Sequence, residues 1–154
     1  MAFDRKRIEA ELALDLIPCS EMPRIAWDAL EAGMDGRAIR RLAALENPTF
    51  FQVQDVLPGA CEEMQLKKLS PGAAALRIAA LWANDILIND QDPQQHCAKF
   101  SQLWINSGYP HEIASIGNLD DDIWVAQSCG QSDREIRQWV TDRLREIIRC
   151  AAHQ

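Results

Sequence analysis

Apolar residues recur along most of this chain at intervals of three and four, the period of an α-helix with one buried face. Ile8, Leu12 and Leu16 show this spacing near the start, and a longer apolar stripe runs from residue 136 to residue 148. No segment has the alternation of apolar and polar residues, bounded by hairpin turns, that predicts a β-strand. The pattern therefore predicts an all-α fold.

Capping residues and prolines divide the pattern into about seven to nine short helices. Some starts combine Ser or Thr with Gln or Glu three positions later, and others place proline directly after a capping residue. The predicted starts of these two kinds are Thr49–Gln52, Ser132–Glu135, Ser70–Pro71 and Asp92–Pro93. Gly33 and Gly108 lie where a helix can end in a left-handed turn.

Weaker signals complete the helix boundaries. Ser20 and Asp35 are expected to cap the second and third helices, and Pro58–Gly59 to break or kink the fourth, whose apolar face includes Phe50. Residues 118–129 fit either a short helix or an ordered loop.

The most apolar segment, Ala73 to Ile88, predicts a helix at the centre of a bundle. Its apolar residues cover nearly the whole helix circumference, whereas Arg77, Asn84 and Asp85 interrupt the run and argue against a membrane span. Short connections imply antiparallel neighbours. We therefore expect residues 1–154 to form a single-domain helical bundle or a stack of helical hairpins.

Length and charge narrow the possible partners. The 154 residues fit one domain, and 16 basic against 23 acidic residues give a net charge of −7. This charge argues against nucleic acid and anionic membranes as partners, and it favours a partner with a basic surface. The charged N-terminus lacks the features of a secretory signal, so we expect a cytoplasmic protein.

Five cysteines stand far apart in the sequence. They occupy positions 19, 61, 97, 129 and 150, an odd number with no C-x-x-C pair. A disulfide framework in a secreted protein usually has an even number of cysteines, and a zinc site needs paired ligands. The expected state is therefore reduced and mostly buried.

Two acidic groups invite comparison with metal sites, but neither has the required pattern. Asp85, Asp90 and Asp92 lack the spacing and distal Glu of a calcium loop, and Asp92 is explained as a helix cap. The run Asp120, Asp121 and Asp122 resembles a solvated helix start. We predict neither a metal nor a cofactor.

Catalytic motifs are also missing from the sequence. It has no G-x-S-x-G, P-loop or G-x-G-x-x-G motif, and adjacent His96 and Cys97 would point about 100° apart on a helix. We expect no catalytic residues and no enzyme. The enzymatic alternative would require Asp90, Asp92, His96 and His111 to converge in one pocket.

A second alternative is a helix-turn-helix regulator. The apolar spacing of such a helix pair is present at Ala29, Gly33, Ile39 and Leu42. Arg37, Arg40 and Arg41 would then lie on the DNA-reading helix. The net negative charge argues against this alternative, because free-standing DNA-binding domains are generally basic.

The five tryptophans fall into two groups: some are predicted to lie in the core, and the others also fit a protein interface. Trp82, Trp104 and Trp139 lie on inward-facing stripes, whereas Trp27 and Trp124 fit either a half-buried position or an interface. Trp124 follows the acidic run 120–122, and an aromatic residue beside acids suits an interface with a basic partner.

The stretch Ile25–Gly33, followed by Ile39–Ala43, resembles the opening of small acidic helical proteins common in bacteria, some of them similar to immunity proteins that neutralise polymorphic toxins. The resemblance implies a non-enzymatic inhibitor that occludes the active surface of a cognate toxin or effector. The expected contact residues are Asp120, Asp121, Asp122 and Trp124, or the edge formed by Asp85, Asp90 and Asp92.

Overall fold

The computed structural model describes residues 2–154, and within this range it is all-helical, without strands. The predicted all-α fold is confirmed. The chain divides into two compact units, the first ending at Lys68 and the second beginning at Leu69. The single all-helical domain expected for residues 1–154 stays a prediction.

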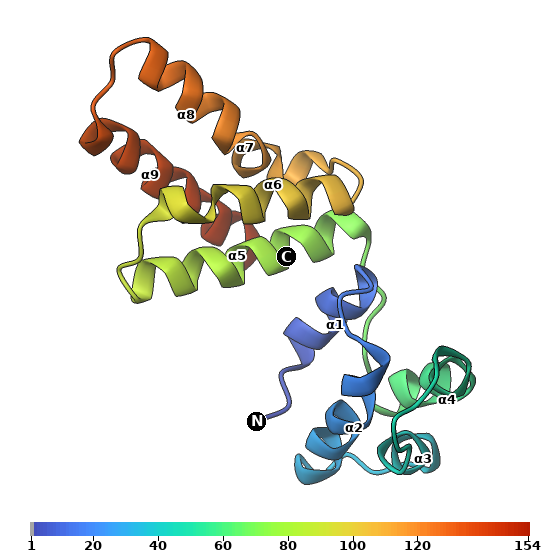
Figure 1. Cartoon of the computed structure of the whole chain (residues 1–154). Coiled ribbons are helices and arrows are strands. Elements are labelled where there is room, and N and C mark those ends of the chain that lie inside the picture. The colour runs from blue at the N-terminus through green and yellow to red at the C-terminus, as the bar shows by residue number, and fades with distance from the viewer. Residues whose placement is uncertain (1) are drawn as a thin grey trace. The chain divides into compact units, whose positions relative to one another are not determined.

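Residues 2–68 of the first unit form four α-helices and one short 3₁₀ turn. The helices are α1 (Arg5–Ala13), α2 (Met22–Glu31), α3 (Arg37–Ala43) and α4 (Phe50–Glu63). Helix α3 packs against both α2 and α4, as Figure 1 shows in blue and green. Ala26, Ile39, Leu42, Val53 and Met64 are buried at these contacts and form the centre of the core.

The predicted boundaries of the first two helices need correction. Helix α1 ends at Ala13, and Asp15 adopts a left-handed φ of 53°, so Leu16 lies beyond the helix and is exposed. Ser20 does not cap α2, because it lies inside the 3₁₀ turn that precedes this helix. The left-handed turn predicted at Gly33 is confirmed by its φ of 86°.

The start of α3 is capped by a distant residue, not by Asp35 as the sequence suggested. The Glu63 carboxylate on α4 accepts hydrogen bonds from the backbone N–H groups of Ala38 (3.1 Å) and Ile39 (2.9 Å). The carboxylate fits because position 36 is glycine: a Cβ there would lie 2.1 Å from Glu63 Oε2. Asp35 instead bonds Arg40.

Helix α4 begins with the predicted capping box of Thr49 and Gln52 but does not break at Pro58. Proline removes one backbone donor and leaves the carbonyl of Gln54 without its helical partner. Both residues are exposed, so water can satisfy that carbonyl. Phe50 is also exposed rather than part of the buried face.

The second unit is built around α5 (Pro71–Ile88). The other helices are α6 (Cys97–Asn106), α7 (Ala114–Gly117), α8 (Leu119–Ser128) and α9 (Asp133–Ala152), with 3₁₀ turns η2 (Pro93–His96) and η3 (His111–Ile113). Helix α5 packs against α9, α6 and η3 (Figure 1). It is not covered on all sides as its apolar circumference predicts, because Leu81 and Ile88 are exposed. Phe100, Ile136 and Leu144 are fully buried in this core.

Local capping signals in this unit are confirmed. Ser70 caps α5, Asp92 caps η2, and Ser132 with Glu135 forms the capping box of α9. Gly108 ends α6 with a φ of 84°. Residues 119–128, for which the sequence left a helix or a loop open, form a helix.

A close helix contact positions the start of α8. The Trp104 ring of α6 lies against Gly117, where an added Cβ would come within 2.4 Å of the ring. Ser101 Oγ donates to the Gly117 carbonyl at 2.8 Å, and Trp104 Nε1 donates to the Pro110 carbonyl at 3.1 Å. These contacts fix α7 on α6 directly before α8 begins.

The five cysteines differ in burial more than the sequence predicts. All five are free thiols, but only Cys97 is fully buried; Cys19 and Cys61 are half-buried, and Cys129 and Cys150 are exposed. The expectation of mostly buried thiols is therefore wrong, because Cys129 and Cys150 lie at the ends of α8 and α9, where little packs over them. Among residues 2–154, no helix combines the length and the apolar character needed to cross a membrane.

Candidate functional site

The outward side of α8 carries acidic and apolar residues together. Leu119, Ile123 and Ala126 recur at helical spacing and face the core. The residues between them therefore face outward, one turn apart. We call Asp120, Asp121, Trp124 and Val125 the α8 face. Three aspartates in the first turn also favour helix formation, since negative charge stabilises a helix N-terminus.

The α8 face is open to solvent. The exposed fraction is 69% for Trp124 and 52% for Val125, and both aspartates are exposed. Among the described residues, neither the Asp120 nor the Asp121 carboxylate forms a hydrogen bond or an ion pair. The face thus combines free negative charge with apolar surface.

Asp122 lies beside this face and is engaged inside the molecule. Its carboxylate pairs with Arg143 of α9, and the same guanidinium donates to the Ser115 carbonyl at 3.0 Å. Arg143 also lies over the Trp139 ring, 4.6 Å from its centroid. Asp122 therefore links α8 to α9.

The second predicted group, Asp85, Asp90 and Asp92, is also bound by neighbouring residues. Asn89 donates to Asp85 Oδ1 at 2.9 Å, and Arg137 of α9 lies 3.6 Å from Asp90 Oδ1. Asp92 accepts the Gln94 N–H at 3.1 Å as the cap of η2. These three carboxylates have local partners, unlike those of the α8 face.

One carboxylate of each acidic group acts on Cys97. Burial, followed by the charges of Asp120 and Asp92, raises the pKa of the Cys97 thiol to about 11. The thiol donates to the Pro93 carbonyl at 3.6 Å. A thiol with a raised pKa is a poor nucleophile, because the thiolate is the reactive form.

The enzymatic alternative requires residues that the fold keeps apart. Glu112, next to His111, lies against Gly72 at the start of α5, whereas Asp90 and Asp92 follow the end of this helix. An 18-residue helix separates these positions by about 26 Å. Among residues 2–154, no three His, Cys, Asp or Glu side chains are grouped so that they could hold a metal ion.

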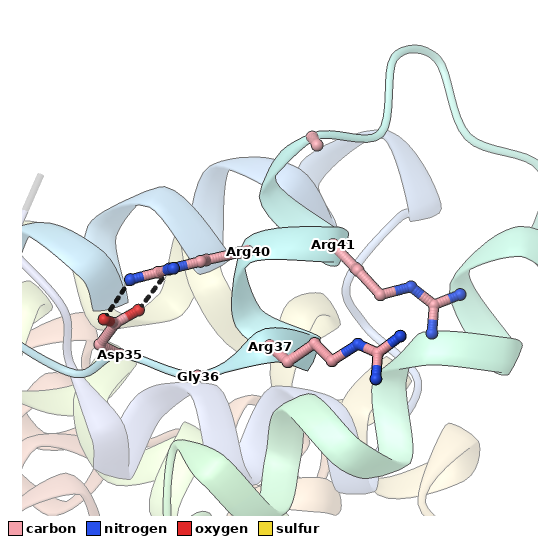
Figure 2. A pocket seen from close by; sticks show the side chains of 6 residues that line it. Asp35, Gly36, Arg37, Arg40 and Arg41 are labelled. Carbon is pink, nitrogen blue, oxygen red and sulfur yellow. Dashed lines mark hydrogen bonds and ion pairs between the residues drawn. The ribbon is translucent and has the colours of Figure 1, made fainter.

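The three arginines of the regulator alternative line a shallow hollow on α3. Figure 2 shows Arg37 and Arg41 on one side of the helix, and Arg40 turned the other way toward Asp35. The Arg40 guanidinium bonds both oxygens of Asp35, at 2.7 and 2.5 Å, and this pairing lowers the pKa of Asp35. Arg40 is therefore held away from any surface that Arg37 and Arg41 would present to DNA.

Some exposed apolar residues escaped the sequence analysis. Val125 could have been assigned to the surface, because the inward spacing of Leu119, Ile123 and Ala126 leaves it outside. Phe51, exposed to 81%, stands in an apolar run whose orientation depends on how α4 packs against α3.

Comparison with protein-family models, curated proteins and solved structures finds no match to this chain.

Proposed function

We propose that this chain is a non-enzymatic, cytoplasmic protein inhibitor of the immunity type, which neutralises a cognate bacterial toxin or effector by covering its active surface. In this proposal the α8 face docks against a basic surface of the partner, and neither a cofactor nor a metal takes part. Membranes and nucleic acid are not its targets.

One observation carries the proposal: the α8 face joins exposed tryptophan and valine to two carboxylates without partners. Tryptophan is enriched among residues that dominate binding energies, especially where neighbouring contacts exclude water. The two carboxylates add complementarity to lysine and arginine on the partner. Asp85, Asp90 and Asp92 suit this role less well because intramolecular partners already engage them.

The rest of the chain supports the same mode of action. A net charge of −7 accelerates encounter with a cationic active site, such as that of an enzyme acting on nucleic acid. Helix α8 is anchored through Asp122 and Arg143, so its outer face is presented on a fixed support. A surface that is already ordered loses little conformational entropy on binding.

Affinity purification tests the proposal with three baits in parallel. The tagged chain, its Trp124→Ala variant and its Trp27→Ala variant are each incubated with lysate of the source organism, and retained proteins are identified by mass spectrometry. Trp27 is a matched control because it is also an exposed helical tryptophan, at 56%, but belongs to α2. The captured partner is then purified and assayed for toxicity.

The expected result is one stoichiometric partner, retained by the wild-type and Trp27→Ala baits and lost by the Trp124→Ala bait. The purified chain should abolish the partner's toxic activity at a one-to-one ratio. A partner retained equally by all three baits would contradict the assignment to the α8 face. A partner whose activity is unaffected by the chain would contradict inhibition.

A further inference from the structure

The hollow on α3 contains two arginines that point the same way. Arg37 and Arg41 are four residues apart, and their guanidinium groups extend from the same side of the helix (Figure 2). Side chains at this spacing are neighbours on a helix surface, and like charges there repel. An anion between them would relieve this repulsion.

Neither guanidinium is strongly held by the protein. In the part of the chain that the structure describes, Arg37 forms no hydrogen bond or ion pair. Arg41 lies 3.6 Å from Asp55 of α4, and both side chains are largely exposed. Such an exposed surface pair contributes little to stability, so a doubly charged phosphate can displace Asp55.

An exposed aromatic pair lies at the start of α4, the helix that carries Asp55. Phe50 and Phe51 begin α4 and contact each other edge-on, with ring centroids 5.7 Å apart. Phe51 precedes Asp55 by four residues, so it lies one helical turn from the carboxylate that Arg41 approaches. Its ring is 81% exposed and available for stacking.

We propose that this surface binds a nucleoside monophosphate, with the phosphate between Arg37 and Arg41 and the base stacked on Phe51. Guanidinium groups bind phosphate oxygens through charged, often paired hydrogen bonds. Base stacking on an aromatic side chain needs only a planar ring and an accessible face. Binding involves no covalent step and is independent of the α8 face.

The size of the ligand follows from the charge of the chain. A long nucleic acid would extend beyond the arginines and meet the surrounding negative charge, which totals −7 over the whole protein. A mononucleotide carries its charge at one end and fits over the two arginines alone. The proposed ligand is therefore a small phosphate ester and not a polynucleotide.

Titration followed by ¹⁵N-detected NMR of the arginine side chains tests this proposal on the full chain. The probes are adenosine monophosphate, adenosine, inorganic phosphate and a double-stranded oligonucleotide. Adenosine monophosphate should shift the Arg37 and Arg41 signals with a Kd on the order of 1 mM or tighter. Phosphate should bind more weakly, and adenosine should leave the arginine signals unchanged.

Substitutions assign the contacts. Arg37→Ala, Arg41→Ala and Phe51→Ala should each weaken binding of adenosine monophosphate about tenfold. Asp55→Asn should strengthen it severalfold, because Arg41 loses its competing carboxylate. Arg24→Ala is the matched control, since Arg24 is an equally exposed arginine of the same unit outside the hollow, and it should change nothing.

Three results would overturn the proposal. The first is the absence of any arginine shift at 10-fold the expected Kd of about 1 mM. The second is binding of adenosine monophosphate that Arg37→Ala, Arg41→Ala and Arg24→Ala weaken equally. The third is tight binding of the double-stranded oligonucleotide together with no response to the mononucleotide, which would favour a DNA-binding helix pair instead.

Discussion

At the scale of single residues, the same side chain behaves differently according to what covers it. Cys97 shares a helical stripe with Phe100 and Trp104, and its predicted burial is confirmed. Burial also raises the pKa of the Cys61 thiol. Cys129 and Cys150 are exposed. Reaction with a thiol reagent in the folded protein should therefore be fastest at Cys129 and Cys150 and slowest at Cys97.

The raised pKa of Cys97 predicts a pH dependence of stability. An unfolded thiol ionises near its ordinary pKa of 9.0, whereas Cys97 in the folded state stays protonated until the pH approaches about 11. Between these values the unfolded state has lost a proton that the folded state retains, so the free energy of unfolding falls as pH rises. Urea unfolding at several pH values measures this decrease.

The variant Cys97→Ala lacks this thiol and should lose less stability than wild type between pH 9 and 11. Cys129→Ala serves as the control and should keep the wild-type pH dependence, since its thiol is exposed in both states. Parallel pH curves for wild type and Cys97→Ala would show that the Cys97 thiol ionises normally in the folded protein.

At the scale of secondary structure, most local capping signals were predictable, although Ser20 does not cap α2 and Pro58 does not break α4, and the distant cap of α3 was not predictable. The capping boxes at Thr49 and Ser132 need only four consecutive residues, so the sequence alone indicates them. The cap of α3 comes from Glu63, about 25 residues away, and depends on how α3 packs on α4. The sequence favours Asp35 for this role because it is the nearest suitable residue before α3.

The candidate site was likewise predictable from the sequence only in part. The sequence showed that Asp120, Asp121 and Trp124 are near neighbours in the chain, but it left residues 118–129 open as a helix or a loop. The structure forms the helix that places these three residues on one face. The pairing of Asp122 with Arg143 was not visible in the sequence, because these residues are 21 positions apart. Which carboxylate stays free is decided by tertiary contacts.

The cap supplied by Glu63 can be tested by removal. Glu63→Ala leaves two backbone N–H groups at the start of α3 without acceptors and should lower the free energy of unfolding by about 1–3 kcal/mol. Glu62→Ala is the control, because Glu62 is exposed on the same helix and should change stability by at most about 0.5 kcal/mol. Equal losses of unfolding free energy in the two variants would contradict the assignment of Glu63 as the cap of α3. Urea unfolding followed by circular dichroism measures both.

At the scale of the whole molecule, the excess of acidic residues is only partly neutralised within the chain. Arg137 and Arg143 of α9 pair with Asp90 and Asp122, but the carboxylates of the α8 face remain free. A general negative field steers basic partners toward the protein, and free carboxylates near the contact determine how strongly salt weakens that steering.

This distribution predicts the salt dependence of association. With the partner captured above, the double variant Asp120→Asn, Asp121→Asn should associate more slowly than wild type, and its rate should respond less to salt. Glu31→Gln with Glu46→Gln changes the net charge equally at exposed sites of the first unit and should have a smaller effect. Stopped-flow fluorescence at several salt concentrations measures the rates. If both double variants behave alike, net charge alone would account for steering.

The central claim is that the α8 face contacts the partner, and the dissociation constant of the Trp124→Ala variant tests it most directly. Calorimetric titration of the purified partner should give a Kd at least about thirtyfold weaker than wild type, as expected when a dominant interface residue is truncated. Trp27→Ala should bind within about threefold of wild type. Wild-type affinity for Trp124→Ala, or a larger loss for Trp27→Ala, would contradict the claim.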